Sequence, residues 1–440
     1  MYLGLDLGTS GLKGAVVAPD QTILAEATAP LSVARHHSGW SEQDPADWIA
    51  ACETVLTALG AKIDLKGIEA IGLSGQMHGA TLLDASDNVL RPSILWNDTR
   101  SAKEAAELDA DPRFRAITGN IVFPGFTAPK LVWCARHEPE LFGKVAKVLL
   151  PKDYLRLWLT GEHVAEMSDA AGTSWLDTGA RDWSDDLLAA TGLTRAQMPR
   201  LVEGSEVSGG LRGDLASRFG IRAGIPVAGG GGDNAASAVG VGVVKAGQAF
   251  VSLGTSGVLF AASDTYQPDA ASAVHSFCHA LPDTWHQMGV ILSAADALNW
   301  FAANLGEDAA ALSGSLGALQ APGKALFLPY LGGERTPHND AAIRASFLHL
   351  DHATGRAAMV RAVLEGVTHA VRDSYDALTG TGTRIESLIA VGGGSRSDYW
   401  LKAIATSLGL PISVPVAGEE DVLKSLRLDF WRPGDDATSL

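Results

Sequence analysis

The sequence is poor in cysteine and has no long apolar run. Its 440 residues include only three cysteines, Cys52, Cys134 and Cys278, and none belongs to a Cys-x-x-Cys pair. Isolated cysteines are typical of a chain in a reducing compartment rather than of a disulfide framework. No run of about 18 apolar residues occurs, so no membrane-spanning helix is expected. The N-terminus lacks the basic and apolar segments of a secretory signal, and we therefore predict a cytoplasmic protein.

Basic residues are scarce relative to acidic ones. The chain has 34 Lys and Arg against 50 Asp and Glu, which gives a formal net charge of −16. Nucleic acids and anionic membranes attract basic surfaces, so the sequence predicts neither as a partner. A nucleotide ligand needs only local hydrogen-bond donors and is compatible with this charge.

Two common phosphate-binding patterns are also absent. The sequence contains no GxxxxGKS or GxxxxGKT, and a strand pattern follows the first glycine-rich turn where a dinucleotide-binding GxGxxG would require a helix. Instead, the pentapeptide LGTSG occurs twice, at residues 7–11 and 253–257, each time between two short apolar runs. Glycines let backbone approach a ligand, and the N–H groups and hydroxyls of such a turn suit an anion. We predict two phosphate-binding turns.

The repeat extends beyond the pentapeptide. In each half a helical pattern follows the turn, and then a strand begins with Ile-Glu and ends in glycine: IEAIGLSG from residue 68 and IESLIAVGG from residue 385. The matched order indicates a duplicated α/β fold with ligand at the strand ends between the halves. We place the boundary before residue 223, giving domains of residues 1–222 and 223–440.

Local patterns predict individual elements. Residues 2–31 alternate as three strands in a meander, and Asp44-Pro45 is a helix-start signal. Residues 290–305 are expected to form a helix with Trp300 and Phe301 buried. Thr354 is expected to cap a long helix.

These motifs together resemble a known family. The paired turns, GGGGDNA (229–235) and VGGGSRSD (391–398) resemble the FGGY carbohydrate kinases. GFTAPKLVW (125–133) and SFLHLDHATGRAAMVRAVLEG (346–366) are similar to the two stretches by which that family is usually recognised. Within the family, SGQMHG, LWNDTR and GERTPH are similar to the xylulose kinase subgroup.

The resemblance implies two duplicated actin-like ATPase (ribonuclease H-like) domains with a cleft between them. It also implies transfer of a phosphoryl group from MgATP to the 5-hydroxyl of D-xylulose. The expected partners are a small sugar and ATP, and a homodimer is compatible with the sequence. Rival hypotheses are an FGGY kinase for ribulose, another ketose or a polyol, a non-kinase ATPase of the same fold, and a nucleotide-impaired sugar-binding protein.

Phosphoryl transfer needs a base near the nucleophile, a divalent cation and donors for the phosphates. Asp233 is the predicted base, because the four glycines before it leave no side chain to crowd a substrate, and the resemblance gives the matching Asp this role. Asp6 lies beside the first turn, where a carboxylate is repelled by phosphate unless a cation intervenes. We therefore expect Asp6, with Asp233, to bind Mg²⁺ partly through water. Lys13 is expected to neutralise charge on the γ-phosphate.

The remaining candidates form two sets. The predicted sugar site, which needs dense polar groups and an apolar wall, consists of Gln76, Met77, His78, Trp96, Asn97, Asp98, Arg100, Asp233 and Asn234. Within it, Arg100 either contacts the sugar or pairs with a carboxylate that fixes the pocket. The predicted ATP site consists of Gly8, Thr9, Ser10, Gly11, Lys13, Gly254, Thr255 and Ser256 for the phosphates, and of Gly392, Gly393, Gly394 and Ser395 for the adenosine.

The resemblance is lost abruptly near Glu419. The family pattern continues into an Ala/Gly-rich helix, whereas this chain reads EDVLKSLRLDFWRP from Glu420. The change is similar to that of a frameshifted or truncated gene end. We therefore expect the adenine side of the pocket to be incomplete, with weak ATP binding and retained sugar binding.

Overall fold

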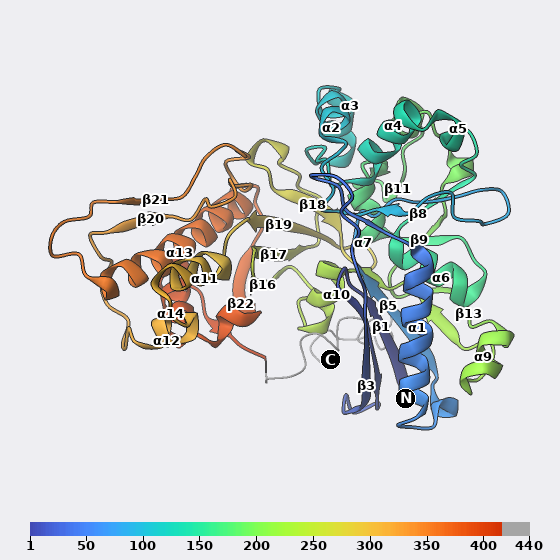
Figure 1. Ribbon diagram of the computed structural model, residues 1–440, viewed down its shortest axis with the longest axis horizontal. Helices are drawn as coiled ribbons and strands as arrows, with labels where there is room; N and C mark the ends of the chain where they lie inside the picture. The colour runs from blue at the N-terminus through green and yellow to red at the C-terminus, as the bar shows by residue number, and fades with distance from the viewer. Residues whose placement is uncertain (416–440) are drawn as a thin grey trace. The chain divides into compact units, whose positions relative to one another are not determined.

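The structure, a computed structural model, describes residues 1–415, which fold as two compact units (Figure 1). Within the described residues, the first unit comprises residues 1–242 and 277–284, and the second comprises the rest. The division differs from the boundary expected before residue 223, because β14 (Pro226–Ala228) and β15 (Gly231–Gly232) pair with a strand of the first unit. The expected departure near Glu419 lies outside the described residues.

The first unit is built on a seven-stranded sheet. Its strand order is β13-β14-β5-β1-β2-β3, with β15 also paired to β5. Besides β14 and β15, the strands of this sheet are β1 (Tyr2–Leu7), β2 (Gly11–Val17), β3 (Ile23–Pro30), β5 (Ala70–Gly75) and β13 (Val207–Gly210). The expected three-stranded meander is confirmed as β1–β3, and β5 pairs with β1 in parallel.

Helix α1 (Pro45–Gly60) shows how sequence signals become packing. The Asp44 carboxylate accepts a hydrogen bond from the Ala46 N–H at 2.9 Å, and Pro45 occupies the first helical position, as expected. Trp48 and Val55 repeat at helical spacing and are completely buried against the sheet, in one core with α6 (Pro151–Thr160) and α9 (Gly213–Phe219). This core holds one face of the sheet rigid beneath the strand ends.

The other elements of the first unit surround this sheet. The helices are α2 (Ala102–Asp109), α3 (Pro112–Thr118), α4 (Thr127–His137), α5 (Pro139–Phe142), α7 (Met167–Ala170), α8 (Asp185–Ala190) and α10 (Asp233–Gly240). The strands are β4 (Glu42–Gln43), β6 (Thr81–Leu83), β7 (Ser93–Ile94), β8 (Lys147–Leu149), β9 (Val164–Glu166), β10 (Leu176–Asp177), β11 (Asp182–Trp183) and β12 (Arg200–Val202).

The second unit repeats the central arrangement. Its six-stranded sheet has the order β18-β19-β17-β16-β22-β23. In both sheets an antiparallel hairpin carrying LGTSG, β1–β2 or β16–β17, is followed by a parallel partner strand, β5 or β22. The strands of this sheet are β16 (Gly247–Leu253), β17 (Gly257–Ser263), β18 (His275–Cys278), β19 (Trp285–Ile291), β22 (Ile385–Val391) and β23 (Ile412–Ser413). The last two residues of β18 belong to the segment 277–284 that is counted with the first unit. The predicted duplication of an α/β fold is confirmed.

Two helices of the second unit begin at other residues than the sequence predicted. They are α11 (Ala295–Leu305), α12 (Ala309–Gly314), α13 (Arg356–Gly380) and α14 (Asp398–Leu408), beside the hairpin β20 (Leu326–Leu328) and β21 (Ser346–Leu348). The helix predicted over residues 290–305 begins only at Ala295, because residues through Ile291 pair with β17. The N-cap of α13 is Gly355, and the Thr354 hydroxyl instead donates to Asp351. Within residues 1–415, no helix has both the length and the apolar composition needed to span a membrane.

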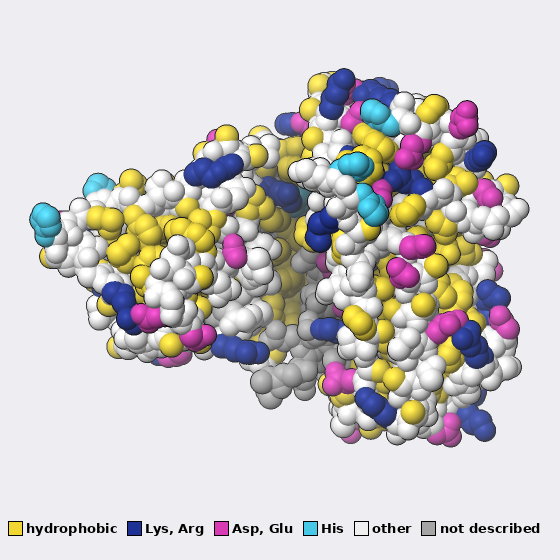
Figure 2. Space-filling model, viewed as in Figure 1, with side chains coloured by type: hydrophobic (Ala, Val, Ile, Leu, Met, Phe, Trp, Pro, Cys, Tyr) yellow, Lys and Arg dark blue, Asp and Glu magenta, His cyan; other side chains and the backbone are white. Residues whose placement is uncertain are grey.

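The expectation that Trp300 is buried is also wrong, although Phe301 is buried as expected. One face of the Trp300 ring stacks on Phe327 of β20, with centroids 6.1 Å apart, while the side chain stays 40% exposed. Figure 2 shows hydrophobic side chains on this face of the second unit, over α11 and the β20–β21 hairpin, where Leu326 and Leu348 are also exposed. The 3.6-residue period places Trp300 and Phe301 on adjacent sides of the helix, and only the side that carries Phe301 packs against the core.

The glycines before Asp233 serve packing within the first unit. A Cβ on Gly230, whose φ is +79°, would lie 2.1 Å from the Leu73 carbonyl oxygen, and one on Gly232 would lie 2.9 Å from Met77 Sδ. The run therefore brings β15 close to β5, and the expected reason for the glycines, space for a substrate, is replaced by close backbone approach.

We predict that Gly230→Ala lowers the stability of the first unit by about 3 kcal/mol or more, since backbone strain adds to a clash with main chain. Gly220→Ala is the matched control: its φ is +70°, and nothing lies within 4 Å of the added Cβ. This control is expected to lose only about 1 kcal/mol. Thermal and urea unfolding measure both variants, and equal losses would contradict the packing argument.

Candidate functional site

The site in the first unit is organised by the register of β5 with its neighbours. Ser74 of β5 lies opposite Asp6 of β1 on one side and Gly231 of β15 on the other. The Ser74 hydroxyl donates to Asp6 Oδ1 at 2.8 Å. Because all three strands are parallel, the residues that follow them emerge at the same edge of the sheet. The first LGTSG turn region, Gln76 and Asp233 are thereby brought together.

A hydrogen-bond network ties the first turn to the predicted sugar residues. Thr9 Oγ1 donates to Gln76 Oε1 at 2.9 Å and accepts from Trp96 Nε1 at 3.0 Å. The Gln76 amide nitrogen donates to Gln43 Oε1 at 3.0 Å, and Gln43 in turn donates to the Thr9 carbonyl at 2.7 Å. Gln43 was not anticipated from the sequence, because nothing in its local pattern distinguishes it from a loop residue. The network engages both ends of the Gln76 amide within the protein.

The turn itself is closed by backbone bonds. The Gly8 N–H donates to the Gly11 carbonyl at 3.0 Å, and the Ser10 carbonyl accepts from the Leu31 N–H at 2.9 Å. Ser10 is exposed, as is Lys13, which lies opposite Asp6 in the β1–β2 ladder. The predicted phosphate donors thus lie on a rigid hairpin. The Asp6 carboxylate and the Lys13 amine belong to paired residues of its two strands.

His78 is held in an unusual conformation. Its φ is +68°, its ring stacks on Phe126 with centroids 4.7 Å apart, and its Nδ1 lies 2.7 Å from the Gly172 carbonyl oxygen. A carbonyl oxygen only accepts, so Nδ1 carries the proton, and in the neutral ring Nε2 is an acceptor. A Cβ on Gly172 would lie 2.4 Å from the imidazole ring, so the glycine admits it. Met77, beside Gly232, is buried.

The second predicted sugar segment contains both accessible and internally paired residues. Trp96 is 48% exposed and Asn97 is half-buried. In contrast, the Arg100 guanidinium pairs with Asp98 Oδ2 at 2.7 Å and with Glu42 Oε1 at 2.7 Å, and it lies 3.6 Å from the centroid of the Trp40 ring. Both side chains of the Arg100–Asp98 pair are almost wholly buried. Arg100 therefore holds the segment from Trp96 to Arg100 in place through its ion pairs with Asp98 and Glu42. Pairing with a carboxylate is one of the two roles that the sequence left open.

Asp233 begins helix α10. Its Oδ1 accepts from the Asn234 N–H at 2.7 Å and from Asn234 Nδ2 at 3.0 Å. A helix N-terminus stabilises a carboxylate, which suits a base that has to be ionised before it acts. The Asn234 amide is thus directed at Asp233.

A fully buried charged cluster lies behind this loop. Lys152 Nζ is 2.9 Å from Asp153 Oδ1, 3.6 Å from Glu166 Oε1 and 3.4 Å from Asp169 Oδ2. Burial raises the pKa of Asp169 well above its usual range, and the negative charges of Asp153, Glu166 and Asp233 act in the same direction, against Lys152. Such a cluster cannot be read from the sequence, because its members are dispersed over α6, β9 and α7.

Arg156 and Ser168, which contact Asp153 and Glu166 of this cluster, bind the glycine run. Arg156 donates to the carbonyls of Ala228, at 2.7 Å, and Gly229, at 2.5 Å. The Gly232 N–H donates to Ser168 Oγ at 3.0 Å, and that hydroxyl donates to Glu166. The loop that carries Asp233 is therefore fixed by buried polar partners on both sides of its glycines.

The second LGTSG turn lies at the start of α11. The carbonyls of Gly254 and Thr255 accept from the N–H groups of Ala295, at 2.8 Å, and Ala294, at 2.9 Å. Gly392, whose φ is +83°, approaches so closely that a Cβ would lie 3.1 Å from the Gly254 nitrogen. The turn and the glycine-rich end of β22 are thus in contact, while Thr255 and Ser256 are exposed.

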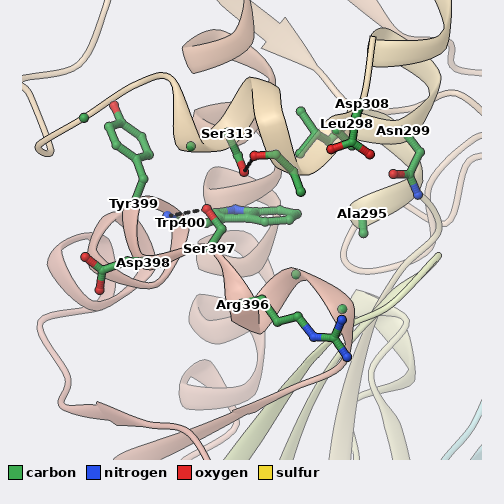
Figure 3. A pocket seen from close by; sticks show the side chains of 16 residues that line it. Ala295, Leu298, Asn299, Asp308, Ser313, Arg396, Ser397, Asp398, Tyr399 and Trp400 are labelled. Atoms are coloured by element: carbon green, nitrogen blue, oxygen red, sulfur yellow. Dashed lines mark hydrogen bonds between the residues drawn. The ribbon is translucent and has the colours of Figure 1, made fainter.

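A pocket of about 540 Å³ adjoins this glycine-rich end. Gly393 and Gly394 line it, whereas the Ser395 hydroxyl donates away, to the Gly392 carbonyl at 2.7 Å. Figure 3 shows Trp400 on α14 and Arg396 on the turn before that helix, with Asn299 of α11 and Asp308, the N-cap of α12, also lining the pocket. These lining residues were not anticipated, although Arg396 and Trp400 lie only a short way beyond the glycine run in sequence. The volume lies in the range of small-molecule and cofactor sites.

Within residues 1–415, no group of three or more His, Cys, Asp or Glu side chains gathers as a metal site. Asp6 and Asp233 emerge from strands on either side of β5. Mg²⁺ at nucleotide sites usually keeps several waters and is held by one or two carboxylates plus substrate phosphates. Asp6 and Asp233 are carboxylates of this kind.

Known proteins match both units. The family models for the N-terminal and C-terminal domains of the FGGY carbohydrate kinases match residues 1–240 and 249–423. Xylulose kinase from Escherichia coli K12 is 50% identical over 422 residues, covering 95% of this chain and 87% of that protein.

Solved structures agree. A "xyloylose kinase" from Brucella ovis has a TM-score of 0.96 at 63% identity, covering 98% of this chain and 90% of that one. Xylulose kinase from Rhodospirillum rubrum has a TM-score of 0.89 at 29% identity, covering 96% and 92%. The two units have the two-domain fold of these kinases, which confirms the expected actin-like ATPase fold. The chain belongs to the FGGY family of carbohydrate kinases.

Proposed function

We propose that this kinase transfers the γ-phosphoryl group of ATP to the 5-hydroxyl of D-xylulose, giving D-xylulose 5-phosphate and ADP. The relatives named as xylulose kinases support the sugar. The observation that carries the chemistry is the register around β5, in which Asp233 emerges beside Gln76, Met77 and His78. Polyol-binding side chains next to a carboxylate are what sugar phosphorylation requires and what a partner-binding ATPase does not need.

Asp233 acts as the general base. It takes the proton of the attacking hydroxyl while Asn234 holds Oδ1, so the carboxylate keeps one orientation during the transfer. The hydroxyl oxygen attacks the γ-phosphorus in line, and ADP leaves.

The sugar lies against His78 and Met77 on one side and Trp96 and Asn97 on the other. His78 Nε2 accepts a hydrogen bond from a sugar hydroxyl, because its Nδ1–H is committed to Gly172. Met77 and Trp96 form the apolar wall. Arg100 and Asp98 hold the second segment in place through their ion pair.

ATP binds through the two turns and the pocket of the second unit. Thr9, Ser10 and Gly11, with Gly254, Thr255 and Ser256, donate to the phosphates, and Lys13 neutralises charge that develops on them. Asp6 and Asp233 would hold Mg²⁺ partly through water, and the ion would supply positive charge against the phosphates.

The adenosine occupies the 540 Å³ pocket against Gly393 and Gly394. We further propose that the enzyme acts in the cytoplasm. The three cysteines are buried and unpaired, in keeping with a reducing compartment.

The first prediction for this function is a preference for D-xylulose. Initial rates of ADP release are measured with D-xylulose, ribulose, other ketoses, glycerol and other polyols. We expect kcat/KM for D-xylulose to exceed that for the others by about tenfold or more. A higher kcat/KM for ribulose or glycerol would assign the enzyme to another substrate of the family.

Asp233→Asn is the control for the chemical step, with kcat expected to fall by about 10³-fold. Turnover equal to wild type would remove Asp233 as the base.

The second prediction concerns the nucleotide pocket. Gly393→Val places a side chain into open space in the pocket, since no atom lies within 4 Å of an added Cβ. We expect the KM for ATP to rise by about tenfold or more, while the KM for the sugar changes less than about twofold. Gly380→Val is the matched control: its added Cβ is also without neighbours, and it lies outside the pocket. Unchanged ATP kinetics in Gly393→Val would move the adenosine elsewhere.

A further inference from the structure

Lys130 is completely buried, and it has no carboxylate partner in the part of the chain that the structure describes. Its side chain has no exposed surface, and no ion pair to it forms among residues 1–415. Burial lowers the pKa of Lys130 to about 7, against the opposing effect of the Asp98 charge and together with that of Arg100. A buried amine costs free energy that an apolar side chain of the same volume would not. Packing alone therefore does not explain a lysine at this position.

The Lys130 amine binds two carbonyl groups of the sugar site. Nζ donates to the His78 carbonyl at 2.8 Å and to the Gly125 carbonyl at 2.8 Å. The Thr127 hydroxyl, one turn earlier in α4, donates to the same His78 oxygen at 3.1 Å. One backbone oxygen thus receives two side-chain donors from one helix.

The peptide that Lys130 holds is strained. His78 has φ +68°, and the Gly79 N–H donates to the Met77 carbonyl at 2.9 Å, which closes a three-residue turn around it. A turn of this kind with positive φ is rare and strained. The conformation aims the imidazole at Phe126 and Gly172, and it persists only if neighbouring groups hold it.

Gly125 links this strained turn to the second sugar segment. A Cβ on Gly125 would lie 2.3 Å from the Trp96 carbonyl oxygen, so the backbones of Gly125 and Trp96 are in direct contact. Lys130 Nζ therefore joins the His78 turn, through Gly125, to the segment that begins at Trp96. An apolar residue could fill the same volume but could donate to neither carbonyl.

We propose that Lys130 is a positioning residue for the sugar site, holding the His78 turn and the Gly125–Trp96 contact in register through hydrogen bonds to both carbonyls. The inference rests on the proposed function, since it assumes that His78 and Trp96 contact the sugar. Lys130 does not touch the substrate in this scheme. Its removal lets the turn relax and separates the two walls of the pocket, while the nucleotide pocket of the second unit is unaffected.

The test compares steady-state kinetics of Lys130→Met and Thr127→Val with wild type. Met keeps the length of the lysine stem and removes both donors; Val keeps the shape of Thr and removes one. We expect kcat/KM for the sugar to fall by about 100-fold and about fivefold, respectively, with the KM for ATP within about twofold of wild type. Equal effects on sugar and ATP, or unchanged sugar kinetics, would overturn the proposal. If Lys130→Met does not fold, Thr127→Val decides by the same criterion.

Thermal unfolding separates positioning from a structural role. Lys130→Met removes a buried amine that has no acid partner, so its unfolding midpoint is expected to change by less than about 5 °C. The matched control is Lys152→Met, which leaves the buried carboxylates of Asp153, Glu166 and Asp169 without their lysine and is expected to lower the midpoint by roughly 10 °C. A fall in Lys130→Met as large as in this control, with normal sugar kinetics, would make Lys130 a structural residue only.

The same measurements keep the inference apart from the proposed function. The sugar panel on wild type decides which sugar the enzyme prefers. The ratio of variant to wild type is then measured with that sugar, whichever it is. A preference for ribulose would refute xylulose as substrate and leave the Lys130 ratio to be judged by itself.

Discussion

Strand β5 accepts a parallel neighbour on each side, and the site in the first unit depends on this constraint. β1 brings Asp6 and the first LGTSG turn, and β15 brings Asp233, to the residues that follow Gly75. β15 reaches β5 only because the residues before Asp233 carry no Cβ: one on Gly230 would meet the Leu73 carbonyl at 2.1 Å. Close packing of backbone, rather than any single side chain, therefore sets how far Asp233 lies from the proposed sugar residues that follow β5.

The sequence predicted the fold well where a local pattern coincides with a structural period. The strand alternation of residues 2–31, the Asp44-Pro45 helix start and the repeated order of elements all reappear in the structure. The helix expected from residue 290 begins only at Ala295, because residues up to Ile291 form β19 and pair with β17. Trp300 was expected to be buried together with Phe301, but its side of α11 faces outward.

The site candidates show a similar division. Motif residues such as Gln76, His78 and Asp233 could be proposed from the chain alone, because a polar residue at a strand end is visible in sequence. Gln43 and Lys130 could not, since their importance comes from one carbonyl or amide that a distant segment brings to them. The four glycines were noticed for the space they leave, whereas the structure fills that space with protein.

The two buried lysines of the first unit illustrate how different energetics imply different roles. Lys152 lies among three carboxylates, so it mainly balances charge that burial would otherwise make costly. Lys130 forms no ion pair within residues 1–415, and it binds two carbonyls that belong to the two walls of the predicted sugar pocket. A residue of the first kind stabilises the buried carboxylates behind the loop before Asp233. A residue of the second kind adjusts where folded backbone lies, and small displacements there matter because phosphoryl transfer requires closely aligned reactants.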